Sequence, residues 1–301
     1  MRISTVIILT LTLIMFAANS ILCRLALAGE GMGPVEFALL RLGSGAMVLL
    51  PILLIGLRRG KQEGGNDWGK GYLSFKLANY WQGISLFGYA IFFSLAYVEL
   101  EAATGALILF PTVQISMVGY SIMKGNRLTL MEWTGFLLSF GGLIYLMAPG
   151  VTAPPLVGTI MMILSGVSWS AYSLLGTNQS RPILATARNF LFCWPFLIFL
   201  LGITLIGAIN DVPPLFTTNA VLLSILSGGV ASGIGYILWY VSLARISTTQ
   251  ASVAQLAVPV IAASGGILFL GEQLTLRLMV ASLVILGGVT ITIFGRKRKE
   301  G

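Results

Sequence analysis

The sequence predicts an all-α integral membrane protein whose ten transmembrane helices form two inverted five-helix repeats around a central cavity. Three observations support this prediction. Only 9% of the 301 residues are charged and 56% are hydrophobic, whereas about 25% of the residues of a soluble domain are charged. The charge-free segments have the length of about 20 residues that a membrane-spanning helix needs. The two halves of the chain also carry similar motifs in the same order.

Ten spans follow from the charge-free segments once the longest, 133–180, is divided at its prolines. Pro149 and the pair Pro154-Pro155 interrupt this segment. Because a proline kinks or ends a helix, the segment holds two spans. Strands of a membrane barrel would alternate polar and apolar residues, so helices fit the pattern better. The expected spans are 4–27, 35–57, 79–98, 102–123, 131–148, 156–176, 188–208, 219–243, 249–270 and 276–294.

The internal repeat is visible in three blocks of similar sequence, the last of which matches 140–142 with 286–288. Ser94 begins the motif Ser-Leu-Ala and precedes Pro111 by 17 residues, and Ser242 begins the same motif 17 residues before Pro259. The offset between these two copies is 148 residues. Both prolines fall near the middle of a predicted span, the fourth and the ninth, so they occupy equivalent places in the repeat.

The second block fixes the limits of the two repeats. The segment 125–130 matches 271–276 at an offset of 146, so the register holds apart from a slip of two residues. We therefore expect one repeat in residues 1–148 and the other in 149–301, each with five spans. Because five is odd, the second repeat runs inverted across the membrane. Inverted repeats are characteristic of secondary transporters, in which the two halves exchange conformations.

The basic residues predict the side of the membrane on which each loop lies. With the amino terminus in the cytoplasm, all but three of the 18 Lys and Arg residues fall in cytoplasmic segments, including Arg188 at the start of the seventh span. The exceptions are Arg24, Arg41 and Arg277. This distribution obeys the positive-inside rule. We expect a multi-pass protein of the inner (plasma) membrane with both termini cytoplasmic, and no nucleic-acid partner despite the net charge of +8.

Several ordered motifs resemble those of a known family. They are Pro34 with Arg41 at the start of the second span, 242–245 leading to Pro259, and 268–275 followed by Gly287-Gly288. On these motifs the whole chain resembles the ten-span EamA-type carriers of the drug/metabolite transporter superfamily. The chain departs from that pattern at Phe16-Ala17, where the family often has Trp-Gly, and at Asn126, where an acidic residue is expected.

The resemblance implies a bundle around a substrate cavity and export of amino acids, metabolites or toxic compounds. Together with the repeats it predicts a secondary transporter of small amino-acid-like, zwitterionic or neutral metabolites that works by alternating access as an exporter. The alternative is a flippase or a carrier of lipid-linked or amphipathic drug-like compounds. We expect no enzyme, no cofactor and no metal site, since the chain has no histidine. The expected partners are a small-molecule substrate and membrane lipids, and the chain is a monomer or a homodimer.

Polar and aromatic residues within the predicted spans are the candidates for the site, since a solute cavity combines apolar walls with a few polar groups. The candidate substrate-binding residues are Asn19, Ser20, Tyr89, Gln114, Trp169, Tyr172, Tyr236 and Gln255. The candidate gating residues are Pro111 and Pro259, and Arg24 and Arg41 are candidates for a structural or a substrate-binding charge.

Each candidate also has a structural interpretation, and both remain open. The prolines would be static kinks, and the two glutamines would form hydrogen bonds between helices. Arg41, about six residues inside its helix, would pair with an acid or a carbonyl group instead of a substrate. Two aromatic residues near a helix end, Trp239 and Tyr240, are expected to be interfacial anchors, and Glu132 is expected to cap the fifth span.

Overall fold

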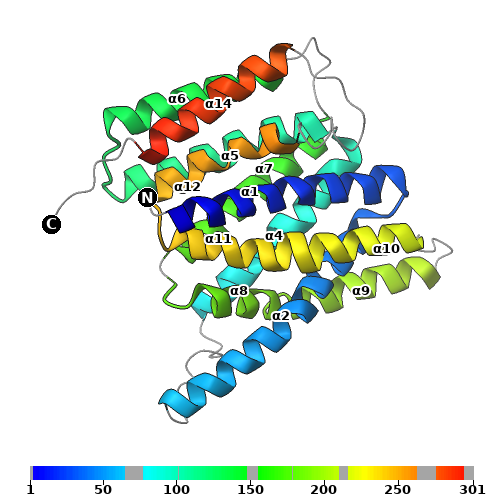
Figure 1. Cartoon of the computed structure of the whole chain (residues 1–301). Coiled ribbons are helices and arrows are strands. Elements are labelled where there is room, and N and C mark those ends of the chain that lie inside the picture. The colour runs from blue at the N-terminus through cyan, green and yellow to red at the C-terminus, as the bar shows by residue number, and fades with distance from the viewer. Residues whose placement is uncertain are drawn as a thin grey trace.

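The computed structural model describes residues 3–64, 77–100, 102–147, 155–177, 179–209, 216–262 and 276–294. All regular secondary structure in these ranges is helical (Figure 1). The first half contains α1 (Ile3–Arg24), the π-helical turn η1 (Leu25–Gly29), α2 (Pro34–Gly64), α4 (Leu77–Glu99), α5 (Ala102–Met123) and α6 (Leu130–Met147). The second half contains α7 (Leu156–Gly176), α8 (Pro182–Leu191), α9 (Trp194–Ile209), α10 (Thr218–Ile225), the π-helix η2 (Leu226–Ile234), α11 (Gly235–Leu243), α12 (Thr248–Ala254) and α14 (Leu276–Phe294).

The predicted all-helical membrane fold is confirmed. Six helical segments of the described chain are long and apolar enough to cross a membrane. Two shorter apolar helices, Ile108–Met123 and Met279–Thr292, lie within α5 and α14. With α6 and α12, these segments correspond to the ten predicted spans. The ninth span beyond residue 262, the motif 268–275 and the side chain of Arg277 lie outside the described part of the chain.

The seventh span begins earlier than predicted. The charge-free pattern predicts a start at Arg188, because the charged residue ends that pattern, but the apolar segment runs from Pro182 to Gly207. The side chain of Arg188 is only 5% exposed, and its Nη2 donates a hydrogen bond of 2.5 Å to Oε1 of Gln82. The assignment of Arg188 to a cytoplasmic segment is therefore wrong, since a polar partner in α4 allows the guanidinium to lie inside the bundle.

The helix contacts follow the pairing that two repeats predict. α4 packs along α7, and α1 packs along the continuous segment of α10, η2 and α11. In the repeat these are equivalent pairs, the third span with the sixth and the eighth with the first. α6 and α14, the last span of each half, pack against each other at one edge of the bundle (Figure 1). The limits of the repeats at residues 148 and 149 stay a prediction.

The two ends of the bundle differ in which loops they carry. α1 begins and α14 ends at the same end, which we call the terminal end, and the connection between α1 and α2, the end of α9 and the start of α10 lie at the opposite end (Figure 1). At the terminal end Glu132 forms a capping box at the start of α6: its Oε2 accepts from the Thr129 backbone N–H at 2.9 Å, and its own N–H donates to Thr129 Oγ1 at 3.2 Å. The predicted capping role of Glu132 is confirmed.

Candidate functional site

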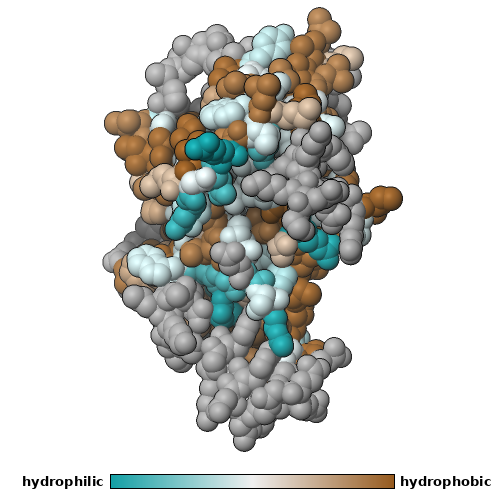
Figure 2. All heavy atoms as spheres, turned by 90° about the vertical axis from the view of Figure 1, so that its left-hand side faces the viewer, coloured by the Kyte–Doolittle hydropathy of each residue, from teal (hydrophilic) through white to brown (hydrophobic). Residues whose placement is uncertain are grey.

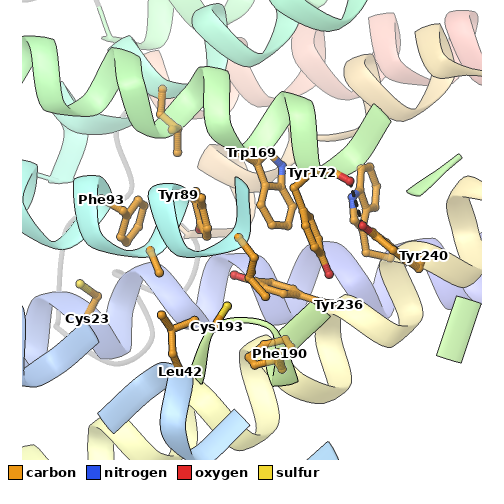
Figure 3. Close-up of a cluster of buried hydrophobic side chains, with 14 of the residues drawn as sticks. Cys23, Leu42, Tyr89, Phe93, Trp169, Tyr172, Phe190, Cys193, Tyr236 and Tyr240 are labelled. Carbon is orange, nitrogen blue, oxygen red and sulfur yellow. Dashed lines mark hydrogen bonds between the residues drawn. The ribbon is translucent and has the colours of Figure 1, made fainter. Parts of the chain in front are cut away.

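Aromatic side chains from four helices meet in the middle of the bundle. Tyr89 of α4, Trp169 of α7 and Tyr236 of α11 point toward one another (Figure 3), and the ring of Trp169 lies 4.7 Å from that of Tyr89 and 5.0 Å from that of Tyr236. Phe16 of α1 contacts Trp169 and Tyr236 edge-on, with ring centroids 5.1 and 5.8 Å apart. These separations are those of favourable aromatic pairs, so the cluster is preorganised.

A small pocket lies beside this cluster. Its volume is about 30 Å³, which is roughly the volume of one water molecule, so a metabolite enters only if the surrounding helices separate. The pocket is lined by Phe16, Ser20, Tyr89, Phe93, Leu109, Phe110, Val113, Trp169, Gln255 and Val258. Four of the eight predicted substrate-binding residues, Ser20, Tyr89, Trp169 and Gln255, are therefore brought together.

The two predicted gating prolines flank the pocket at equivalent positions. Phe110 precedes Pro111, Val258 precedes Pro259, and both of these neighbours line the pocket. The prolines nevertheless differ in effect. α5 continues through Pro111, whereas the ninth span is interrupted directly after α12 and resumes as a helix only at residue 257.

Pro259 gives a physical reason for this interruption. A proline has no N–H with which to bond the carbonyl four residues earlier, here that of Gln255. That carbonyl instead accepts from the N–H of Val258 at 3.0 Å, a tighter turn than an α-helix makes. The side chain of Gln255 lies at this break, where its Oε1 accepts a 2.5 Å hydrogen bond from Nε1 of Trp169. The amide of Gln255, at the break, therefore holds the Trp169 indole in the pocket wall.

Arg41 is the buried cation at the centre of the site. It lies seven residues from the start of α2 and is 1% exposed. Its Nε donates to Ser232 Oγ at 3.0 Å, and its Nη2 donates to the hydroxyls of Tyr236 at 2.7 Å and Tyr89 at 3.4 Å. The guanidinium carbon also lies 5.2 Å from the ring centroid of Tyr89 and 5.5 Å from that of Phe93.

The partners of Arg41 differ from the expectation. It does not pair with an acid among the described residues, and the three groups that accept its hydrogen bonds are neutral hydroxyls. Its Nη1 is buried and has no hydrogen-bond partner. The expected pairing with an acid or a carbonyl group is therefore wrong, because the facing helices present Tyr and Ser at the depth of Arg41.

The π-helix η2 shapes the surface that faces Arg41. Six of the nine residues of η2 are Gly, Ser or Ala, and Gly228 and Ser232 lie against α2, on which Arg41 is placed. π-helical turns in longer helices are frequent at functional sites. Ser227, one residue before Gly228, donates a short hydrogen bond to Oδ1 of Asn19. Asn19, a predicted substrate-binding residue, is thus engaged between α1 and η2 and does not line the pocket.

A second aromatic layer lies on the terminal side of the first. Tyr240 donates from its hydroxyl to the backbone carbonyl of Tyr172 at 2.9 Å, and Nε1 of Trp239 donates to Ser173 Oγ at 3.0 Å. Both Trp239 and Tyr240 are fully buried in the bundle. The prediction that they are interfacial anchors is wrong, since their polar atoms find partners on α7 inside the bundle and do not need the membrane interface. Tyr172 and Tyr236 do not line the pocket, but their rings pack against Trp169, which does.

Two other candidates do not reach the pocket. Arg24 is exposed at the end of α1. Gln114 is fully buried, and neither its amide nitrogen nor its amide oxygen has a hydrogen-bond partner. Phe16, Phe93 and Ser232 were not among the predicted site residues. The one available signal was the position of Phe16, where the resembling family often has a different aromatic residue.

A larger pocket opens at the terminal end of the bundle. Its volume is about 640 Å³, and residues from the ends of α5, α6, α7, α11 and α12 line it. The polar and charged members of this lining are Tyr120, Ser121, Lys124, Asn126, Arg127, Glu132, Thr177, Ser247, Thr248 and Thr249. Figure 2 shows this end, with hydrophilic side chains among the hydrophobic residues of the surface.

The fold and the pockets define the class: a multi-pass helical membrane protein with a central pocket and a wider pocket at one end. The model of the EamA-like transporter family matches residues 3–148 and 156–294. The chain belongs to this family, and the predicted resemblance is confirmed.

Three relatives cover most of the chain. It is 38% identical to an uncharacterized protein of Pseudomonas aeruginosa over 99% of this chain and 98% of the relative. It is 23% identical to an uncharacterized transporter of Archaeoglobus fulgidus over 97% of this chain and 98% of that protein. A probable amino-acid metabolite efflux pump of Salmonella typhimurium is 25% identical over 73% of this chain and 76% of the pump. A solved crystal structure shares the fold, with a TM-score of 0.74, 19% identity, and coverage of 99% of this chain and all of that chain.

Proposed function

We propose that this protein is a secondary transporter that exports small amino-acid-like, zwitterionic or neutral metabolites by alternating access. The observation that carries the proposal is the aromatic pocket in the middle of the bundle, between a closed end and an open one. An apolar and aromatic lining with few polar groups suits a small organic solute once the helices separate. The name of the Salmonella typhimurium relative, an amino-acid metabolite efflux pump, supports this substrate class. The proposal gives the chain no catalytic reaction.

The asymmetry of the two ends supports alternating access. The terminal end has a pocket of about 640 Å³. At the opposite end Glu30 accepts hydrogen bonds from Thr217 at 2.8 Å and from Asn219 at 3.3 Å, which joins the α1–α2 connection to the start of α10. The positive-inside distribution of the sequence supports a cytoplasmic location for the terminal end. In the inner (plasma) membrane the wider pocket would then face the cytoplasm, and the central pocket would be closed to both sides.

The alternative is a carrier of lipid-linked or amphipathic drug-like compounds. The aromatic walls around Trp169 would also suit an apolar body. The uncompensated charge of Arg41 disfavours lipophilic cations, the usual form of such drugs, because like charges repel strongly where water is excluded. We therefore retain the metabolite exporter as the leading function.

Replacing Trp169 with Ala should sharply lower export by the protein that is correctly inserted. Trp169 lines the central pocket and its indole is held by Gln255, so Ala removes the wall that contacts the solute. We expect export to fall at least tenfold, the effect of about 1.4 kcal/mol of lost transition-state stabilisation. The measurement is an untargeted comparison of metabolites in the medium of cells producing wild type, Trp169→Ala or Trp194→Phe. Trp194 is 48% exposed and serves as the matched control.

The outcome separates the two functions. A compound class that accumulates in the medium with wild type and Trp194→Phe, but not with Trp169→Ala, supports export and names the substrate. If correctly inserted wild type exports nothing, the metabolite exporter is contradicted and the lipid or drug carrier takes its place.

Replacing Pro259 with Ala should slow transport without preventing insertion. Ala restores an N–H that can bond the Gln255 carbonyl, so the break after α12 would straighten and turn the Gln255 side chain away from Trp169. Pro111→Ala, in the unbroken α5, is the matched comparison and should have the smaller effect. Transport rates in proteoliposomes test this, and equal rates for Pro259→Ala and wild type would argue against a hinge.

A further inference from the structure

We propose that Arg41 binds the carboxylate of the transported molecule, so that the substrate is a small carboxylate with an apolar or aromatic body. This inference rests on the proposed transport function and assigns a chemical class to its substrate. It starts from an imbalance of charge: the guanidinium of Arg41 is buried at the middle of the bundle, and no acid among the described residues pairs with it.

A buried and unpaired cation is expensive to maintain. Neutral hydroxyls from Ser232 and Tyr236 orient the guanidinium, but they do not neutralise its charge. Buried charges in proteins are normally paired with an opposite charge. A ligand that brings a negative charge into the bundle would supply that pairing, which favours binding of an anionic group at this place.

Two nitrogens of Arg41 can donate hydrogen bonds to such a group once Tyr89 moves. Nη1 of Arg41 has no partner. Nη2 donates a hydrogen bond of 2.7 Å to the Tyr236 hydroxyl and a longer one of 3.4 Å to the Tyr89 hydroxyl. Tyr89 is therefore the more weakly bound partner. When the Tyr89 hydroxyl is displaced, Nη1 and Nη2 present the parallel pair of N–H donors that binds a carboxylate through both oxygens.

Tyr89 also connects Arg41 to the pocket. Tyr89 and Phe93 line the pocket, and the same two rings lie 5.2 and 5.5 Å from the guanidinium of Arg41. Movement of Tyr89 would therefore open the pocket toward the cation. A ligand carboxylate would then reach Arg41 while its body contacts Phe16 and Trp169, which both line the pocket.

The test compares pairs of compounds that differ only in the carboxylate. Purified full-length protein in proteoliposomes is loaded with leucine, phenylalanine and their primary amides, and efflux is measured by mass spectrometry. Each amide keeps the side chain and the amine but lacks the anionic oxygens. We expect wild type to carry each acid at least tenfold faster than its amide, because a bidentate charged pair is lost with the carboxylate.

Three variants assign the preference to Arg41. Arg41→Gln should lower acid efflux at least tenfold and leave amide efflux within about threefold of wild type. Arg41→Lys keeps the charge but loses the paired donors, so its acid efflux should lie between that of Arg41→Gln and that of wild type. Arg24→Gln, at an exposed arginine of α1, should match wild type. The Tm of Arg41→Gln in detergent should equal or exceed that of wild type, because an unpaired buried charge has been removed.

Each contrary result has a distinct meaning. Wild type that carries acid and amide equally, or Arg41→Gln that keeps acid efflux, overturns the role of Arg41 and leaves the proposed transport function standing. A lowered Tm with loss of both acid and amide efflux shows a structural arginine and also overturns the inference. Wild type that carries neither compound contradicts the transport proposal for this class together with the inference.

Discussion

Replacing Gly228 with Ala is expected to prevent the protein from reaching its folded state. A Cβ at this position would overlap the carbonyl oxygen of Arg41 and lie 2.7 Å from its carbonyl carbon. These are backbone atoms of α2, so neither a rotamer change nor a side-chain shift removes the clash. Overpacking that requires the backbone to move destabilises by more than about 3 kcal/mol, and the clash falls on the residue that carries the buried guanidinium.

The measurement is the yield and Tm of detergent-purified protein. Gly43→Ala is the matched control, because Gly43 is also a glycine of α2 and a Cβ there meets nothing within 4 Å. In a helix Ala is favoured over Gly by about 1 kcal/mol, so this control should be as stable as wild type or more stable. Recovery of Gly228→Ala with the yield and Tm of wild type would show that α2 and η2 are less closely packed than described.

The helical fold was predictable because it depends on local properties of the sequence. Charge-free length defined eight of the spans to within a few residues, as in α7, where the predicted 156–176 matches Leu156–Gly176, and the end predicted for the ninth span lies outside the described residues. The start of the seventh span differs from the prediction because Arg188 can lie inside the bundle only when Gln82 accepts a hydrogen bond from its guanidinium. That contact joins residues 106 positions apart, and no local pattern predicts such a pairing.

The site was predictable only in part for the same reason. Polar and aromatic residues at mid-span depth identified Tyr89, Trp169 and Gln255, which the structure brings to one pocket. Depth along a span does not say which face of the helix points inward. Trp239 therefore looked like an interfacial anchor, although its indole bonds Ser173 inside the bundle. Phe16 was missed because a Phe in a membrane helix is ordinary by composition.

A second long-range constraint lies at the contact between α6 and α14. A Cβ on Gly288 would lie 2.6 Å from the carbonyl oxygen of Gly135 and 2.7 Å from the backbone nitrogen of Ser139. Small residues allow helix backbones to approach this closely in a membrane, where packing drives association. A larger side chain must separate the two helices along their length. We therefore expect Gly288→Leu to yield no folded protein.

The neighbouring glycine gives a control that differs by one position. A Cβ on Gly287 meets nothing within 4 Å, so Gly287→Leu should resemble wild type in yield and Tm. The equivalent glycines of the first repeat should differ in the same way but by less. A Cβ on Gly141 meets nothing within 4 Å, whereas a Cβ on Gly142 would lie 2.9 Å from Cγ1 of Ile285, a side-chain atom that can shift. Leu should therefore be tolerated at 287 and 141, harmful at 142 and most harmful at 288. Equal losses of yield and Tm for Leu at 287 and at 288 would contradict a contact made by one face of α14. Leucine would then destabilise α14 without regard to the packing against α6.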